Sequence, residues 1–166
     1  MRWYNYFRNV FNMGKNVRRF SQNSKDKLKG VDPDIVAVLN IAIIESPYDF
    51  SIVQGVRSQD YQDELYTQGR TTAALRAAGI MDKEGKPHLP KVTWTRNSKH
   101  IPAEDGYGKA IDFAAYIDGK ISWDDKYYKP IADKIISVGK KMGVELESGA
   151  YWNTPDWGHI QKKEAV

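Results

Sequence analysis

The chain has 166 residues, three histidines, no cysteine and a formal net charge of +4. This length predicts one domain with room for a buried core, and the lack of cysteine excludes disulfides, thiolate metal sites and a cysteine nucleophile. Hydrophobic residues make up 41% and charged residues 28%, which is typical of a folded protein and excludes a disordered one.

The positive charge is concentrated at the N-terminus. Residues 1–29 hold eight basic residues and one acid, whereas the remainder holds seventeen basic and twenty acidic residues. Residues 1–19 combine basic and aromatic side chains near helical spacing, which predicts an arm that lies on an anionic envelope surface or packs on the body as an extra helix. Because no nucleic-acid-binding motif accompanies the charge, we expect no nucleic-acid partner.

Periodicity and turn residues predict a series of short helices and strands. The clearest helix starts at Pro33, behind the capping residue Asp32, and ends before Pro47. The other expected elements are strands over 50–56, 109–117, 120–122, 144–147 and 158–161, and helices over 58–68, 71–78 and 124–142. Residues 79–99, which contain glycines, prolines and scattered charges, predict a long surface loop.

The order of these elements predicts the fold class. Asp118-Gly119 is a strong hairpin signal, so at least one strand pair is expected to be antiparallel. Helices alternate with short strands, which predicts an α+β fold with a small, mostly antiparallel sheet flanked by helices.

Two histidines and two aspartates are candidates for a metal site. Asp112 lies in an apolar strand, where a carboxylate is costly to bury unless it is paired or bound to a cation. With His100 and His159 it would form a three-ligand zinc shell with an open fourth position, and Asp156 could take a proton from an attacking water. The ordinary alternatives remain open at this point, since a single histidine is more often structural and Asp112 could pair with a lysine.

Two motifs resemble those of a known family. The segments at 98–100 and 108–112 resemble the SxHxxGxAxD signature of the VanY/D-alanyl-D-alanine peptidase family of zinc peptidases, and the segment at 156–159 resembles its second motif. Further segments resemble a subgroup of that family, the L-alanyl-D-glutamate peptidase endolysins of bacteriophages. These are residues 46–58, 110–125 and 148–153, and the similarity extends from about Phe20 to Gln161.

The resemblance implies a role for each motif residue. His100, Asp112 and His159 correspond to the ligands of a catalytic Zn²⁺, and Asp156 corresponds to the general base. Arg57 corresponds to an arginine that steadies the substrate and the developing oxyanion, with a surface salt bridge as the ordinary alternative.

Two further residues correspond to positions that contact or support the substrate. Gln62 occupies the place of a polar residue that contacts the peptide, and its ordinary alternative is a solvated helix face. Ser98 matches the motif serine, for which a substrate-binding or supporting role is expected.

The spacing between two of the expected ligands departs from the family pattern. Asp112 lies twelve positions after His100, where a step of seven is usual, because residues 101–107 lengthen the loop. The ligands can still converge if the extra residues bulge outward. Glu104 and Asp105 add carboxylates near the site, which we expect to be solvated and not to bind a second cation.

The resemblance also implies a fold and an activity. Residues 20–166 would form a hedgehog/D-Ala-D-Ala-peptidase-like catalytic domain that cleaves the L-Ala/D-Glu bond of the peptidoglycan stem peptide. The alternatives are a D-alanyl-D-alanine carboxypeptidase or dipeptidase of the same family, or a non-catalytic wall-binding module, against which Asp156 argues.

The resemblance to phage endolysins implies where the protein acts. No stretch approaches the roughly 18 apolar residues that span a bilayer, and no export signal is recognisable at the N-terminus. We therefore expect a monomer that accumulates in the host cytoplasm and reaches the wall after a holin-type release.

Overall fold

The computed structural model describes residues 17–163, so the predicted arm over 1–19 lies almost wholly outside the described residues. At its end, Arg18 donates a hydrogen bond to the carbonyl oxygen of Ser46, and Phe20 is buried in the core. Between residues 17 and 163, no helix is both long and apolar enough to cross a membrane.

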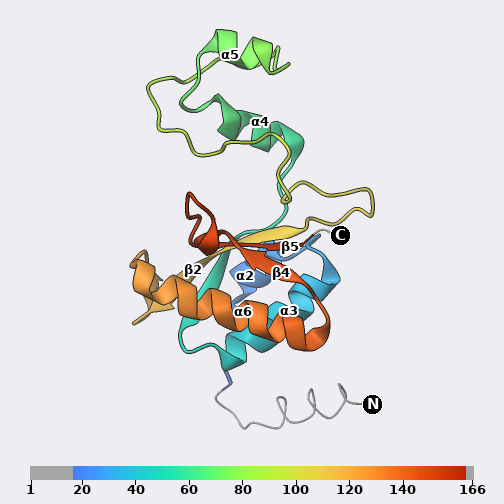
Figure 1. The fold of residues 1–166 in the computed structure, drawn as a ribbon, viewed down its shortest axis with the longest axis vertical. Coiled ribbons are helices and arrows are strands. Elements are labelled where there is room, and N and C mark those ends of the chain that lie inside the picture. Colours follow the sequence, from blue (N-terminus) through green and yellow to red (C-terminus); the bar gives the residue numbers. More distant parts are fainter. Residues whose placement is uncertain (1–16, 164–166) are drawn as a thin grey trace.

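A small antiparallel sheet lies at the centre of the molecule (Figure 1). Over the described residues its order is β1-β2-β5-β4, with β3 paired to β2 beyond the end of β5. The strands are β1 (Asp49–Gln54), β2 (Ala110–Ile117), β3 (Lys120–Ser122), β4 (Leu146–Ser148) and β5 (His159–Lys162). This arrangement confirms the predicted α+β class.

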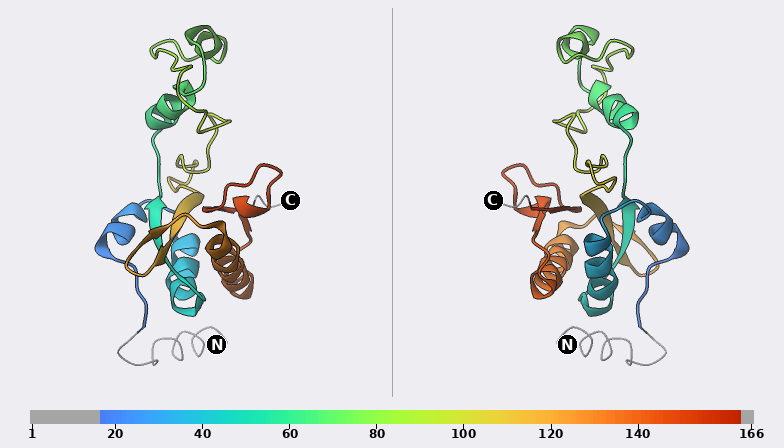
Figure 2. Two further views of the ribbon diagram at one scale, coloured as in Figure 1. Left: turned by 90° about the vertical axis from the view of Figure 1, so that its left-hand side faces the viewer. Right: turned by 90° about the vertical axis from the view of Figure 1, so that its right-hand side faces the viewer.

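Two long helices cover one face of this sheet (Figures 1 and 2). Helix α3 (Pro33–Glu45) begins as predicted, because the Asp32 side chain accepts a hydrogen bond from the amide of Asp34 and Pro33 occupies the first turn. Helix α6 (Tyr128–Met142) follows the 3₁₀ turn η1 (Asp125–Tyr127). Apolar side chains of both helices and of β2 form the core, which includes Ile35, Leu39, Phe113, Ile131 and Ile135.

An upper lobe, residues 58–99, projects away from the helices (Figure 1). It contains α4 (Gln59–Thr67) and α5 (Thr72–Ala77), and residues 79–99 form neither helix nor strand, as predicted. Polar contacts hold this long loop to α4: Arg96 donates from Nε and Nη2 to the two carboxylate oxygens of Asp63, at 2.9 and 2.8 Å. Such paired contacts fix both the position and the orientation of the loop.

Two short elements were not expected. Helix α2 (Gln22–Lys27) begins at Ser21, whose hydroxyl accepts from the amide of Ser24, and the 3₁₀ turn η2 (Gly149–Tyr151) precedes β5. With six residues, α2 is too short to show a periodic apolar stripe. It is held by its contact with β1, where the Ser24 hydroxyl accepts from the amide of Ile52.

Candidate active site

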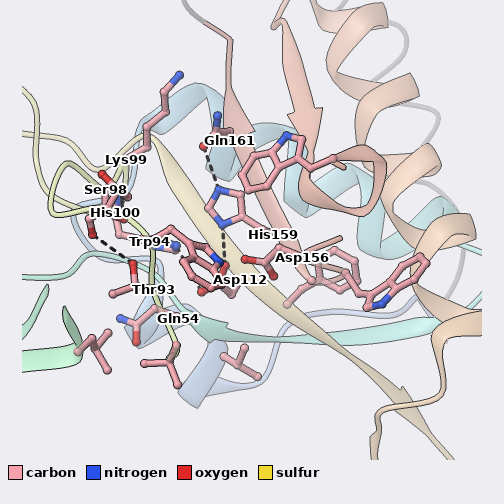
Figure 3. A pocket seen from close by; sticks show the side chains of 18 of the residues that line it. Gln54, Thr93, Trp94, Ser98, Lys99, His100, Asp112, Asp156, His159 and Gln161 are labelled. Atoms are coloured by element: carbon pink, nitrogen blue, oxygen red, sulfur yellow. Dashed lines mark hydrogen bonds and ion pairs between the residues drawn. The ribbon is translucent and has the colours of Figure 1, made fainter. Parts of the chain in front are cut away.

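All the candidate residues except Gln62 line one cleft beside the sheet (Figure 3). The cleft has a volume of about 1010 Å³. Asp112 on β2 lies directly opposite His159 on β5, and His100 ends the segment that returns from the upper lobe. Three segments that are distant in sequence therefore place their side chains at one point.

The His100, Asp112 and His159 side chains are close enough to hold one metal ion. Their candidate ligand atoms all lie within 4.8 Å of one another. Asp112 Oδ2 lies 3.3 Å from His100 Nε2, and Asp112 Oδ1 lies 2.9 Å from His159 Nδ1. Zinc binds imidazole nitrogen and carboxylate oxygen at about 2.0–2.2 Å, so small side-chain shifts would bring all three to one ion.

The second ring nitrogen of each histidine has its own partner. His100 Nδ1 lies 2.7 Å from the carbonyl oxygen of Gly55, an acceptor only, which fixes the proton on Nδ1 and leaves the Nε2 lone pair facing Asp112. His159 Nε2 lies 3.0 Å from Gln161 Oε1, which leaves Nδ1 facing Asp112 (Figure 3). Hydrogen bonds of this kind orient imidazole rings as metal ligands, so the donor set fits a metal ion.

The electrostatics of the cluster favour an ionised carboxylate. Burial acts to raise the pKa of Asp112, but the interactions with the adjacent His100 and His159 side chains outweigh it and hold the pKa well below its usual range. Burial likewise acts to lower the pKa of His159, and its hydrogen bond to Asp112 reverses this, so that the pKa is raised. The ionised Asp112 carboxylate thus lies where a cation would bind.

Asp156 lies at the rim of the same cleft and is not one of the clustered ligands. Although the residue is exposed, the cleft walls partly desolvate its carboxyl, and the negative charge of Asp112 acts in the same direction, so the pKa of Asp156 is raised. Its backbone amide donates to the carbonyl oxygen of Gly149 at 2.9 Å, which fixes the turn that carries it. The position suits a proton acceptor beside the cluster.

Arg57 is held between the cluster and the upper lobe. Its Nη2 lies 3.6 Å from Asp112 Oδ2, and its Nη1 donates to Gln62 Oε1 at 2.7 Å. The backbone amide of Arg57 donates to the carbonyl oxygen of His100 at 2.9 Å. The guanidinium is therefore fixed at the cleft wall, where it is 12% exposed.

Gln62 does not occupy the place expected for a peptide-contacting residue. Its side chain is fully buried, and its Nε2 donates to Thr93 Oγ1 and to the carbonyl oxygen of Thr95, at 3.0 and 2.7 Å. It therefore links Arg57 to the cleft wall and faces neither solvent nor the cleft. Ser98 lines the cleft, and its hydroxyl accepts from the amide of His100 at 3.3 Å.

The lengthened loop at 101–107 bulges outward, which is the condition for the ligands to converge. Residues 102–107 are exposed, and the loop closes on itself through a hydrogen bond from the amide of Ala103 to the carbonyl oxygen of Tyr107. Asp105 lies at the surface, where it forms an ion pair with Lys109 and is not simply solvated.

A close backbone contact at Gly158 sets the position of His159. A Cβ on Gly158 would lie 2.3 Å from the carbonyl oxygen of Phe113, which is shorter than any tolerated contact. The glycine lets the two strands meet, and its carbonyl oxygen accepts from the amide of Phe113 at 2.9 Å. Gly158 and Phe113 are the direct neighbours of His159 and Asp112, so this contact lies next to the Asp112–His159 pair of the sheet.

Sequence reasoning missed two residues that support the site. Gln161 lies two residues after His159, and because alternate strand residues share a face, this spacing could have indicated it. Thr93 comes from an irregular loop and carries no periodic signal. Its contact with Gln62 depends on how residues 79–99 return to the sheet.

Comparisons with known proteins agree with this geometry. The family model described as phage L-alanyl-D-glutamate peptidase matches residues 16–164. The L-alanyl-D-glutamate peptidase of Escherichia phage T5 is 34% identical over 156 residues, which cover 86% of this chain and 96% of the relative. The peptidoglycan L-alanyl-D-glutamate endopeptidase CwlK of Bacillus subtilis (strain 168) is 32% identical over 129 residues, which cover 74% of this chain and 66% of the relative.

A solved structure has the same fold. The L-Ala D-Glu endopeptidase ChiX of Serratia marcescens superposes with a TM-score of 0.65 at 29% sequence identity. The superposition covers 89% of this chain and 92% of that protein.

Proposed function

This chain belongs to the phage L-alanyl-D-glutamate peptidase family, and from that premise we propose that it hydrolyses the L-Ala–D-Glu bond of the peptidoglycan stem peptide. The observation that carries the proposal is the convergence of a His–Asp–His cluster with Asp156 and Arg57 in one cleft. Relatives named for this activity, from a phage and from a bacterium, support it.

Zn²⁺ is the metal that we assign to His100, Asp112 and His159. Two imidazoles and one carboxylate form a donor set that zinc accepts, and three protein ligands leave a position open for chemistry. When bound, zinc supplies a Lewis acid that polarises a carbonyl and lowers the pKa of water to about 7.

Asp156 is the proton carrier of the proposed reaction. Its carboxylate accepts a proton from the attacking water and passes that proton to the amide nitrogen of D-Glu as the C–N bond breaks. The products are a carboxylate on L-Ala and an ammonium group on D-Glu, because the leaving amine also takes up the second proton of the water, so the proton count balances. The raised pKa of Asp156 makes it a stronger base than an ordinary aspartate.

Arg57 stabilises the negative charge that develops on the carbonyl oxygen. A guanidinium is always charged, and contacts with Gln62 and Asp112 hold this one in position, so it needs no reorganisation during the reaction. In this proposal, Gln62 positions Arg57 and does not touch the peptide. Ser98 supports the backbone that carries His100.

The proposed place of action is the host cell wall during phage lysis, which the similarity to a phage T5 peptidase supports. Release by a holin-type route and attraction of the basic N-terminal residues to an anionic envelope belong to the same proposal.

Digestion of purified peptidoglycan followed by mass spectrometry tests the activity. The wild type is expected to release fragments with new L-Ala carboxyl and D-Glu amino ends, and a chelator is expected to stop the reaction. Asp156→Asn should retain the bound metal but lose about 10²–10⁴-fold in rate. The control variant Asp82→Asn alters an exposed loop carboxylate that does not line the cleft.

Two results would contradict the proposal. Free D-alanine without L-Ala/D-Glu cleavage would identify a D-alanyl-D-alanine carboxypeptidase instead. Full lytic activity of Asp156→Asn would remove Asp156 from the mechanism.

A further inference from the structure

Two tryptophans on the cleft wall are far more exposed than tryptophans usually are. Trp94 and Trp123 are each 70% exposed, although both line the cleft that contains the His–Asp–His cluster. An exposed aromatic ring in a binding cleft offers an apolar surface that a ligand can cover. Lys91 Nζ lies 4.7 Å from the centre of the Trp94 ring, whereas within residues 17–163 the Trp123 ring has no aromatic or cation contact.

The strand register places Trp123 on the same face of the sheet as Asp112. Phe113 and Ala115 belong to the core beneath the sheet, so Asp112 faces the cleft. Ser122 pairs with Ala115, and Trp123 follows it on the cleft side, where it lines the wall. Continued by one residue, this register brings Trp123 to the level of Ala114, which at about 3.3 Å per residue lies about 7 Å along β2 from Asp112.

The proposed substrate has a sugar at a matching distance from the bond that is cleaved. On the N-terminal side of the L-Ala–D-Glu bond there is one amino acid, L-Ala, which is joined through a lactyl ether to N-acetylmuramic acid. One residue spans at most about 3.5 Å, and the lactyl group is of similar length, so the sugar ring begins about 7 Å from the scissile carbonyl.

A sugar ring needs both an apolar and a polar partner. Its C–H face is flat and packs on an indole, while its hydroxyl and acetamido groups need hydrogen-bond partners. Asp125 also lines the cleft, and its carboxylate has no hydrogen bond or ion pair in the described part of the chain. Trp123 and Asp125 together therefore present the two kinds of surface that a sugar requires.

We propose that Trp123, with Asp125 beside it, forms a subsite for the N-acetylmuramic acid ring that carries the stem peptide. The proposal rests on the proposed function, since it assumes cleavage at the L-Ala–D-Glu bond. It makes the enzyme specific for stem peptides that still carry N-acetylmuramic acid, as opposed to free peptides.

Two substrates that differ only in the sugar test this subsite. The first is an N-acetylmuramoyl tetrapeptide, and the second is the same tetrapeptide carrying an N-lactyl group without the ring. We expect the wild type to cleave the first with a higher kcat/KM. Trp123→Ala should lose about tenfold in kcat/KM on the first substrate, which corresponds to about 1.4 kcal/mol, and should be unchanged on the second.

Two control variants sharpen the comparison. Trp123→Phe keeps an aromatic face and should retain most of the preference for the sugar-bearing substrate. Met81→Ala removes a side chain that is 69% exposed but does not line the cleft, and should change neither rate.

A binding measurement provides a readout that does not depend on turnover. N-acetylmuramoyl-L-alanine lacks the scissile bond, and its addition should shift the Trp123 indole N–H resonance in the NMR spectrum, whereas N-lactyl-L-alanine should not.

Three results would overturn the subsite. These are equal losses of Trp123→Ala on both substrates, no loss on either, and no shift of the indole resonance. If the wild type cleaves neither substrate between L-Ala and D-Glu, the proposed function fails, and the subsite falls with it.

Discussion

At the scale of single residues, Gln62 connects the cleft wall to Arg57, whose guanidinium lies 3.6 Å from Asp112. Its amide oxygen accepts from Arg57, and its amide nitrogen donates to Thr93 and Thr95. A buried amide whose oxygen and nitrogen both form hydrogen bonds holds its partners in place, because any movement would leave a buried polar group without a hydrogen bond.

Replacement of Gln62 tests this positioning role. In Gln62→Leu the Arg57 Nη1 group loses its acceptor, so we expect kcat to fall about 10- to 100-fold with little change in KM. The free energy of unfolding should fall by about 1–3 kcal/mol. Gln59→Leu is the control, because it removes an exposed amide on the same helix that contacts Asp63 and Arg96 but not Arg57. A raised KM with unchanged kcat would instead favour direct contact with the peptide.

Among single residues, the motif residues of the site could be predicted from the sequence, whereas the role of Gln62 could not. His100, Asp112, Asp156 and His159 stand in short motifs whose spacing is visible along the chain, and the structure brings them together in one cleft. The burial of Gln62 could not be predicted, because its contacts come from the irregular loop at 79–99.

At the scale of elements, helices and strands with a start or stop residue were predicted well. The Asp118-Gly119 turn was recognisable because both residues adopt positive φ, 50° and 78°, as a two-residue hairpin requires. Gly143 ends α6 with φ of 74°, as its position after the apolar stripe predicted. Helix α2 was missed, because its position depends on tertiary contact with β1 and not on a pattern of its own.

The start of α3 is joined to the sheet by ion pairs. Asp32 caps the helix, and its Oδ2 accepts from Lys109 and Lys162 at 2.7 and 3.1 Å, while the side chain is only 6% exposed. Burial acts to raise the pKa of Asp32, but the hydrogen bonds from the two lysines outweigh it, so the pKa is lowered from 3.8. The folded state therefore binds this proton less readily than the unfolded state.

Removal of the Asp32 charge should lower the free energy of unfolding in a pH-dependent way. Asp32→Asn keeps a capping side chain but loses the ion pairs, so we expect a loss of about 1–3 kcal/mol at pH 7. Because the folded pKa lies below the unfolded one, the contribution is complete above the ordinary value of 3.8 and disappears as the pH falls through the folded pKa. Urea unfolding at pH 7 and at lower pH measures the difference.

The neighbouring acid provides a control for this element. Asp34 pairs with Lys162 but is 62% exposed, so Asp34→Asn should cost less than about 1 kcal/mol. A difference between wild type and Asp32→Asn that stays constant from pH 7 to low pH would show that the charge of Asp32 does not contribute.

At the scale of the whole molecule, the His100–Asp112–His159 cluster joins the segment that follows the upper lobe to the central sheet. His100 follows the upper lobe, whose attachment depends on polar contacts such as Arg96–Asp63, whereas Asp112 and His159 belong to the central sheet. A metal ion bound by all three would restrain the lobe relative to the sheet. Binding would therefore stabilise the folded state as well as supply the chemistry.

This coupling predicts that metal raises the thermal unfolding temperature. At a free metal concentration about 100 times Kd, binding contributes about 2.7 kcal/mol, which corresponds to a rise in Tm of roughly 5–10 °C. Calorimetry with Zn²⁺ and with a chelator measures the shift. His159→Ala should abolish it, whereas His88→Ala, which removes an exposed histidine outside the cluster, should retain it. An equal rise in Tm with Zn²⁺ in both variants would place the stabilising metal outside the cluster, because His159 is a ligand of the cluster and His88 is not.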